Sequence, residues 1–438
     1  MKDSDIEWLG NIPLNWDIHS LKRVLSTPIT DGPHETPILY DEGIPFVSAE
    51  SVKGGVINLD YKRGYISLED HKRFQRKVSP KKGDIFIVKS GATTGNVGLA
   101  ITDQVFDIWS PLALVRGDSS AVEQEFLYYL LLSHIFRVQV EQGWSYGTQQ
   151  NISMKALGNI KIMVPPLEEQ KTIIKYLHNK CTQIDTIIAK EQSVIEKLQE
   201  YKRAIITEVI TKGLYPATNI KYSGFEWLRD IPVTWNVRRL KRVLITPITD
   251  GPHETPTLYD EGIPFVSAES VKGGIINLDY KRGYISMEDH EKFQRKVSPK
   301  KGDIFIVKSG ATTGNIGLVI TDQIFDIWSP LALVRGDSSI VEQEFLYYQL
   351  LSNIFRVQVE QGWSYGTQQN IGMKALGNIK VIVPPLEEQR TIVKYLHKKC
   401  ANIDSTILKK QSIIEKLNEY KQSLVYEVVT GKKEVPHV

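Results

Sequence analysis

RKVSPKKGDIFIVKSGATTGN, at residues 76–96, recurs unchanged at residues 295–315 of this 438-residue chain. The same offset of 219 (295 − 76) carries IFRVQVEQGWSYGTQQNI from residues 135–152 to residues 354–371. Solenoid repeats are much shorter, about 20 to 50 residues. The chain therefore contains two whole globular copies, an organisation typical of a two-site or two-fold-symmetric binder.

Composition places the chain among globular proteins of about two to four domains. Hydrophobic residues make up 41% of it, and no run of 18 apolar residues occurs. The first residues, MKDSDIEWLG, hold no apolar signal core. We therefore expect neither a transmembrane nor a secretory segment, no membrane partner, and a cytoplasmic location.

Charge is concentrated in one region of each copy, although the net charge is only +3. A patch of this kind suits the phosphates of a nucleic acid, and a solvated charged face explains it equally well. The basic residues of the first copy are Lys62, Arg63, Lys72, Arg73, Arg76, Lys77, Lys81, Lys82 and Lys89, and most of them recur from Lys281 to Lys308.

The first 160 residues of each copy indicate an α+β domain. The segments IPFVSAE, GDIFIVKSG, VFDIWSPLALV and IKIMVPP are β-branched or aromatic runs bounded by turn residues, which is typical of strands. One helix is expected from Glu123 to Gly143, where apolar residues recur at helical spacing.

A long helix is predicted after each domain. Between Pro166 and Gly213 the chain has no glycine or proline, and steps of three and four residues from Ile174 to Val209 meet apolar side chains at nine of eleven positions. Such a helix, on the order of 65 Å long, needs a partner. The linker of residues 213–222 is too short to return along it, so we expect the two long helices to pair antiparallel, with one domain at each end and approximate two-fold symmetry.

No catalytic or metal motif is present. KSGATTGN lacks the spacing of a P-loop, and His34 has no HExxH partner. Cys181 and Cys400 are the same residue in the two copies and are expected to be buried free thiols. A nuclease-like pairing of Asp84 with Lys89 lacks a second acidic residue.

Three polar loops combine glycine turns with side chains that can contact bases or phosphates. They are TDGPHETP at residues 30–37, KSGATTGN at 89–96 and GWSYGTQQN at 143–151. Glutamine and asparagine can pair with adenine, and lysine, serine and threonine can bind phosphates. Turn formation alone explains the glycines, but it does not explain a tryptophan, a tyrosine and two glutamines in one short loop.

The order of the motifs resembles the specificity subunits of Type I restriction-modification systems. The resemblance rests on DIEWLGNIPLNWDIHSLKRV and its second form GFEWLRDIPVTWNVRRLKRV, on PPLEEQ at the start of each long helix, and on EVITKGL at the end of the first. It implies two target-recognition domains at residues 1–160 and 220–379, and long helices at 165–212 and 384–431 that form an antiparallel coiled coil. It also implies a non-catalytic subunit that binds double-stranded DNA, two modification subunits and two restriction subunits. S-adenosylmethionine, ATP and magnesium are expected in those partners and not in this chain.

This sequence departs from the usual family pattern, in which the two recognition domains differ. Here the domains are nearly identical and the substitutions are denser in the helices. Two like readers on a two-fold axis should bind like half-sites on opposite strands, so we predict an interrupted palindrome. Among the few domain differences, Leu130 becomes Gln349 and Ser153 becomes Gly372; the second borders the GTQQN loop and could alter a half-site.

Individual roles follow from the loops and the basic patch. Backbone anchors are expected at Arg63, Arg73, Arg76 and Lys77 and at Arg282, Lys292, Arg295 and Lys296. Tyr201 and Tyr420, beside the helical seam, are candidates for docking the modification subunits. Base or phosphate contacts are expected at Thr30, His34, Thr36, Lys89, Ser90, Thr93, Tyr146, Thr148, Gln149 and Gln150, and at Thr249, His253, Thr255, Lys308, Ser309, Thr312, Tyr365, Thr367, Gln368 and Gln369.

Two other functions compete with DNA recognition. A coiled-coil scaffold whose two heads capture a protein partner explains the repeat and the helices, but not the loop chemistry. An enzyme acting alone would need a catalytic motif that the sequence does not show.

Overall fold

The computed structural model describes the 438 residues except 5, 7–8, 145–149, 216–218, 363–368 and 437–438. By its internal contacts the chain divides into two units. Unit 1 comprises residues 1–191 and 412–438, and unit 2 comprises residues 192–411. Each unit holds one sheet domain with parts of two long helices, so the predicted mixed α+β fold with repeated domains is confirmed.

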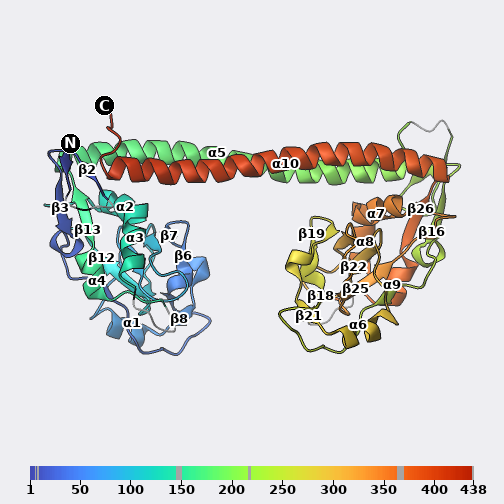
Figure 1. Cartoon of the computed structure of the whole chain (residues 1–438), viewed down its shortest axis with the longest axis horizontal. Coiled ribbons are helices and arrows are strands. Elements are labelled where there is room, and N and C mark those ends of the chain that lie inside the picture. The colour runs from blue at the N-terminus through green and yellow to red at the C-terminus, as the bar shows by residue number, and fades with distance from the viewer. Residues whose placement is uncertain (5, 7–8, 145–149, 216–218, 363–368, 437–438) are drawn as a thin grey trace. The chain divides into compact units, whose positions relative to one another are not determined.

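The sheet domain of unit 1 is built around a six-stranded sheet of order β4-β12-β9-β10-β7-β6 (Figure 1). A three-stranded sheet of order β11-β5-β8 and two pairs, β1-β2 and β3-β13, complete it. The strands are β1 Lys2–Asp3, β2 Asn11–Ile12, β3 Asp17–Ser20, β4 Thr30–Asp31, β5 Ile44–Val47, β6 Val52–Lys53, β7 Val56–Ile57, β8 Gly64–Ile66, β9 Ile85–Val88, β10 Val97–Leu99, β11 Asp107–Ile108, β12 Leu112–Val115 and β13 Lys161–Val164.

Strand β9 shows why the sequence GDIFIVKSG folds as a central strand. Successive side chains of a strand point to opposite faces of the sheet. Ile85 and Ile87 join the core that also contains the domain's helices, whereas Phe86 and Val88 join a second core with β5 and β11. Because both faces are covered, all four residues are buried and apolar.

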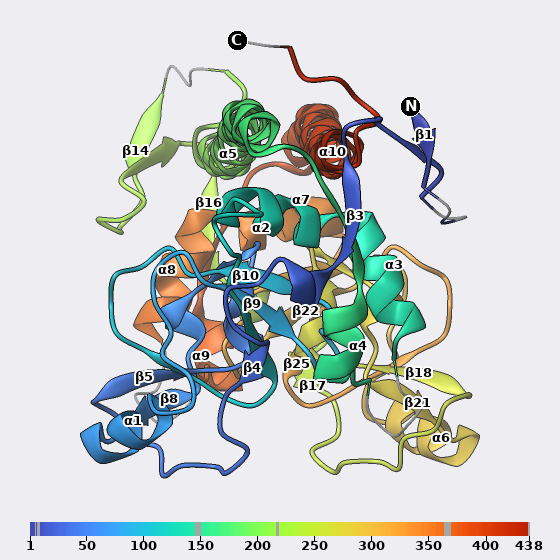
Figure 2. The same cartoon turned by 90° about the vertical axis from the view of Figure 1, so that its left-hand side faces the viewer.

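The helices of unit 1 are α1 Leu68–Phe74, α2 Gln124–Leu132, α3 His134–Gln142, α4 Met154–Asn159 and the first part of α5 Leu167–Lys212. Both views place α1 and β8 at the end of the domain away from the long helices, and Figure 2 shows β5 beside them (Figures 1 and 2). The domain therefore presents its small sheet and α1 on the side opposite α5.

Two predicted elements are interrupted in the structure. The helix expected from Glu123 to Gly143 breaks at Ser133, whose backbone is extended and whose hydroxyl donates to the carbonyl of Leu130. Such side-chain bonds compete with helix continuation. The strand expected at residues 105–115 is two strands, β11 and β12, separated by a turn in which the N–H of Leu112 donates to the carbonyl of Trp109.

The PPLEEQ motif fixes the start of each long helix to its domain. Glu169 accepts hydrogen bonds from the indole of Trp16 at 2.9 Å and from Asn15 at 2.8 Å. Gln170 is fully buried and accepts the backbone N–H of Glu123, just before α2. In unit 2, Trp235 donates to Glu388 and Gln389 accepts the N–H of Glu342.

In each unit the two long helices run in opposite directions. In unit 1, Lys421 of α10 (Leu386–Val429) pairs with Asp185 of α5. Gly431, just after α10, lies against Pro13 and Trp16, and Trp16 is bound to Glu169 at the start of α5. Leu177, Cys181 and Ile184 of α5 share a core with Leu424 and Val428 of α10. In unit 2, Lys202 of α5 pairs with Asp404 of α10, and Gly213 lies against Trp235 and Glu388.

The sheet domain of unit 2 repeats the same order, β17-β25-β22-β23-β20-β19 with β21-β18-β24 beside it. Cys181 and Cys400 are both buried free thiols. None of the described helices has the length and apolar character needed to cross a bilayer. The elements of unit 2 are β14 Ile220–Tyr222, β15 Asp230–Pro232, β16 Asn236–Arg239, β17 Thr249–Asp250, β18 Ile263–Val266, β19 Val271–Lys272, β20 Ile275–Ile276, β21 Gly283–Ile285, α6 Met287–Gln294, β22 Ile304–Val307, β23 Ile316–Leu318, β24 Asp326–Ile327, β25 Leu331–Val334, α7 Gln343–Leu351, α8 Asn353–Gln361, α9 Met373–Asn378 and β26 Lys380–Val383.

Candidate nucleic-acid interface

Two of the three polar loops are joined by hydrogen bonds. The N–H of Gly91 donates to the carbonyl of Gln150 at 3.0 Å, and the hydroxyl of Thr94 donates to the same carbonyl at 3.2 Å. Two residues further on, the N–H of Ile152 donates to the carbonyl of Lys89 at 2.8 Å. The KSGATTGN loop and the end of the GTQQN loop therefore form one surface. Unit 2 repeats the three bonds at Gly310, Thr313, Gln369, Ile371 and Lys308.

The third loop joins this surface through a buried carboxylate. Asp31, at the end of β4, is 4% exposed and accepts from Lys77 at 2.7 Å. Its other oxygen lies 3.0 Å from Nζ of Lys89 and 3.1 Å from Nε2 of His34. We call Asp31, His34, Lys77 and Lys89 the Asp31 cluster. In unit 2 the same cluster comprises Asp250, His253, Lys296 and Lys308.

The charges of the Asp31 cluster are unequally exposed. The side chain of Lys89 is 13% exposed, that of Lys77 is 44% exposed and that of His34 is 70% exposed. Burial disfavours the ionised form of Asp31, but the hydrogen bonds and charges of Lys77 and Lys89 outweigh it and hold its pKa below the ordinary value. The carboxylate therefore stays ionised at neutral pH, and with two lysines the cluster is cationic.

A fourth segment, Trp109–Ser110–Pro111, lies at the same place and was missed in the sequence. The N–H of Ser110 donates to the carbonyl of Pro33, and the N–H of Lys89 donates to the carbonyl of Pro111. A Cβ on Gly32 would lie 2.2 Å from the carbonyl oxygen of Ile108, so only glycine fits between the two segments. The signal for this segment was its identical repetition, since DIWSPLALV recurs unchanged from residue 326.

The predicted backbone anchors occupy different settings. The guanidinium carbon of Arg63 lies over the ring of Trp109, 4.2 Å from its centroid, and Arg73 pairs with Glu35 at 3.0 Å. Arg76 is exposed, whereas Lys77 belongs to the Asp31 cluster. In unit 2, Arg282 stacks on Trp328, Lys292 pairs with Glu254, Arg295 is exposed and Lys296 binds Asp250.

The remaining predicted contacts fall into three groups. Thr36, Thr93 and Gln150 are exposed, as are Thr255, Thr312 and Gln369. Thr30 and Thr249 are half-buried, with their hydroxyls donating to the carbonyls of Pro28 and Pro247, and Ser90 and Ser309 form isolated bridges to Asn151 and Asn370. The predicted contacts at Tyr146, Thr148, Gln149, Tyr365, Thr367 and Gln368 lie outside the described residues.

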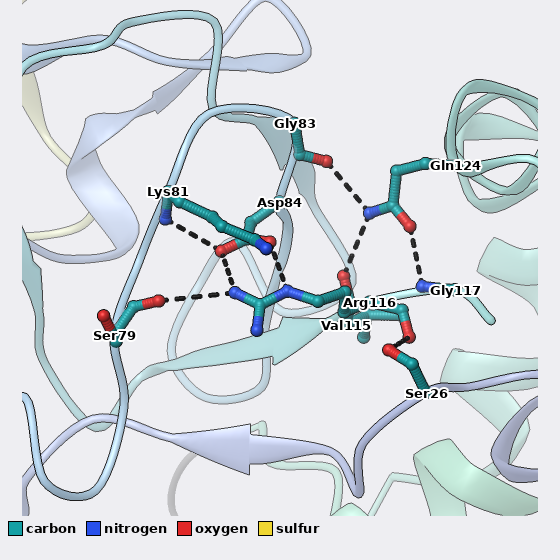
Figure 3. A network of polar contacts seen from close by, with 9 residues as sticks. All are labelled: Ser26, Ser79, Lys81, Gly83, Asp84, Val115, Arg116, Gly117 and Gln124. Atoms are coloured by element: carbon teal, nitrogen blue, oxygen red, sulfur yellow. Dashed lines mark hydrogen bonds and ion pairs between the residues drawn. The ribbon is translucent and has the colours of Figure 1, made fainter. Parts of the chain in front are cut away.

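Asp84 and Lys89, weighed above as a nuclease-like pair, have separate partners. Arg116 binds both oxygens of Asp84, at 2.7 and 2.6 Å, and Gln124 links the neighbouring backbone at Gly83 and Gly117 (Figure 3). Lys89 is bound to Asp31 instead. Across the described ranges, no three His, Cys, Asp or Glu side chains are grouped so that they could hold a metal ion. The network around Asp84 supports β9 and β12 and does not form a reactive centre.

The difference between Ser153 and Gly372 is a helix cap. The Ser153 hydroxyl accepts the N–H of Ala156 at the start of α4, and Gly372 begins α9 with nearly the same backbone angles but no side-chain bond. The loops at residues 30–37, 89–96 and 143–151 are identical in the other copy. The three loops therefore present the same described side chains in the two interfaces, whereas the anchor position of Arg73 holds Lys292 in the second copy.

Comparisons with known proteins cover both copies of the repeat. The profile of the type I restriction modification DNA specificity domain matches residues 27–197 and 232–417. The putative type I restriction enzyme MjaX specificity subunit of Methanocaldococcus jannaschii is 26% identical over 97% of this chain and 95% of its own. The MjaVIII specificity subunit of the same organism is 24% identical over 87% of this chain and 86% of its own. In fold, a solved chain of a type I R-M system superposes with a TM-score of 0.66 at 18% identity, covering 97% of this chain and 100% of that one.

Proposed function

Because this chain belongs to the family of type I restriction modification DNA specificity subunits, we propose that its two domains read the two halves of an interrupted palindrome. The subunit recognises DNA sequence, and methylation and cleavage belong to separate subunits. The proposal of a palindromic site rests on the repetition of the interface. The loops are identical, and each unit holds them with the same hydrogen bonds. Identical readers select identical half-sites.

The proposal also requires the two readers to face opposite strands. We infer that α5 and α10 pair antiparallel along their whole length as an intramolecular coiled coil with an approximate two-fold axis. Two ion pairs support this: Asp185–Lys421 in unit 1 and Lys202–Asp404 in unit 2. They are equivalent by the repeat, because Asp404 is the copy of Asp185 and Lys421 is the copy of Lys202. Antiparallel pairing of this kind presents equal domains in opposite orientations, which matches the symmetry of a palindrome.

The chain acts as the DNA-reading part of a larger assembly. We propose two modification and two restriction subunits per chain, one of each for each half of the symmetric subunit. S-adenosylmethionine, ATP and magnesium would be held by those partners, where the chemistry occurs. Tyr201 and Tyr420, both exposed on the long helices, are proposed docking positions. Because the substrate is DNA, we place the assembly in the cytoplasm.

A bivalent protein scaffold is less favoured. The family match covers both domains, and the cationic Asp31 cluster with neighbouring exposed Thr93 and Gln150 suits phosphates and bases. An acidic protein partner would use the lysines, but it would give no reason for two identical amide-bearing loops.

Binding of short duplexes to the subunit, assembled with its modification partner, tests the palindrome. Each duplex carries the recognised site with one base pair substituted in the left half or the symmetry-related base pair in the right half. The two substitutions should weaken binding equally, by about 1 to 3 kcal/mol each. A penalty that differs between the halves at every related position would contradict identical reading.

A second comparison separates readers from anchors. Replacing Gln150 and Gln369 by Ala should cost on the order of 1 to 3 kcal/mol at one base position per half-site. Replacing Arg76 and Arg295 by Ala should weaken binding to every duplex and lower the slope of log affinity against log salt by about one unit per domain. If the glutamine variant lost specific and non-specific binding alike, Gln150 would not be a base reader.

A further inference from the structure

We propose that Asp31 and its repeat Asp250 are positioning residues that hold the DNA-reading loops of each domain in register before DNA binds. The inference rests on the proposed DNA recognition and adds residues that do not touch DNA themselves. A carboxylate is an unexpected group at such a surface, because it repels phosphates. Its burial and its partners give it a different role.

Asp31 joins segments that are far apart in the sequence. Its carboxylate binds Lys77, which follows α1, and Lys89, which opens the KSGATTGN loop. Lys77 also donates to the carbonyl of Gly32 at 2.8 Å, so its ammonium ties residues 31 and 32 to the segment after α1. Three segments that are distant in sequence are thereby fixed to one another by charge-assisted bonds, which are stronger than neutral ones.

Lys89 makes contacts with both its side chain and its backbone. With its side chain 13% exposed, its ammonium lies below the surface, against Asp31. Its backbone accepts from Ile152 and donates to Pro111, so it also links the GTQQN loop and the Trp109–Pro111 segment. Lys89, predicted from the sequence as a contact to DNA, is in this conformation the link between Asp31 and two other loops. Fixing the ammonium of Lys89 therefore fixes the neighbours that are exposed, among them Thr93 and Gln150.

The carboxylate of Asp31 is the counter-charge of two lysines. A neutral amide in place of Asp31 would leave two ammonium groups together with no counter-charge, and Lys89 would have to move toward solvent. Loops that are ordered only on binding lose affinity to the cost of ordering, and recognition contacts displaced by about 1 Å lose most of their discrimination. Asp31 therefore contributes to specificity through Lys89 and Lys77.

The test uses the full chain assembled with its modification subunit. Asp31→Asn combined with Asp250→Asn removes one negative charge from each domain without changing side-chain size. The matched control is Asp103→Asn with Asp322→Asn, which removes the same charges from the surface ion pairs with Lys82 and Lys301, where the carboxylates are 80% and 79% exposed. Affinity is measured for a duplex carrying the recognised site and for a scrambled duplex of equal length and composition.

Electrostatics alone and positioning predict opposite results. Loss of a negative charge should tighten binding to both duplexes, and this is expected of the control. For the Asp31 and Asp250 variant we expect the specific-to-scrambled ratio to fall about tenfold or more, roughly the value of one recognition contact. Hydrogen exchange should rise at the amides of Gly91 and Ile152, which bridge the loops, and remain slow along β9. A variant that behaves as the control does, with its ratio intact, overturns the inference.

Two further outcomes are separable. If the assembly with the wild-type subunit showed no preference for any duplex, the proposed function itself would be wrong, whatever the result for the variant. If the Asn variant melted early, a form that also carries Lys77→Met and Lys296→Met would restore the original net charge of each cluster while still leaving Lys89 and Lys308 without their carboxylate. That form should show the same tenfold loss of the ratio; a retained ratio there equally contradicts the positioning role.

Discussion

Leu130 and Gln349 occupy equivalent positions of the two copies, and this difference predicts that the two domains are unequally stable. Gln349 is 3% exposed and makes two hydrogen bonds to Ile382 on the outer edge of β26. Its Nε2 donates to the carbonyl at 2.8 Å, and its Oε1 accepts the N–H at 2.6 Å. In unit 1 the corresponding residue of β13, Met163, shares a core with the apolar Leu130.

The loss of stability in a variant at position 349 can be worked out from the backbone groups that lose their hydrogen bonds. In the variant Gln349→Leu, the buried N–H and C=O of Ile382 lose their partners, at about 1 to 3 kcal/mol each. Burial of the leucine returns about 1 to 2 kcal/mol. The net destabilisation of unit 2 is about 2 kcal/mol, or a fall of roughly 4 to 8 °C in its melting temperature for a unit of this size.

Calorimetry of the full chain, with hydrogen exchange on the peptide that contains β26, measures this change. The reciprocal variant Leu130→Gln is the matched control, because it offers the same two bonds to Met163 and should stabilise unit 1. An unchanged or raised stability of unit 2 in Gln349→Leu, together with a lowered stability of unit 1 in Leu130→Gln, would refute the reasoning.

Three other outcomes are expected. Gly32→Ala should destabilise unit 1 strongly, since the added Cβ would lie 2.2 Å from the carbonyl of Ile108, whereas Gly83→Ala, with nothing within 4 Å, should show only the cost of its positive φ in the same melting experiment. Because Lys77 and Lys89 lower the pKa of Asp31, its contribution to stability is complete above the unfolded pKa of about 4 and is lost as pH falls through the folded pKa. In an acid titration, the free energy of unfolding should therefore fall less steeply with decreasing pH for Asp31→Asn with Asp250→Asn, and an identical acid transition would contradict this. Gly372→Ser should stabilise unit 2 by a few tenths of a kcal/mol by restoring the cap seen at Ser153, with no change in the recognised sequence, and a changed sequence would make position 372 a reader.

The parts of the fold that depend on local pattern were predictable. The buried run IFIV of β9 and the glycine-free segment of α5 each carry their periodicity in consecutive residues, so the strand and the long helix follow from the sequence. The break at Ser133 was not predictable, because apolar spacing continues across it and only the hydroxyl bond to Leu130 reveals the change of direction.

The interface was predictable in its loops and not in its centre. Glycine turns with amide and hydroxyl side chains marked residues 30–37, 89–96 and 143–151. Asp31 carried no such signal, because in the sequence a carboxylate near a basic segment is indistinguishable from an ordinary surface charge. Only the folded structure shows that it is buried between Lys77 and Lys89. Tertiary structure alone brings these separated residues together.

Mapping of methylated adenines in a genome that carries this subunit and its modification partner tests the central proposal most directly. Two identical readers held antiparallel predict one interrupted motif whose right half is the reverse complement of its left half, with modified adenines at symmetric positions on opposite strands. An asymmetric bipartite motif, with unrelated half-sites, would contradict the account.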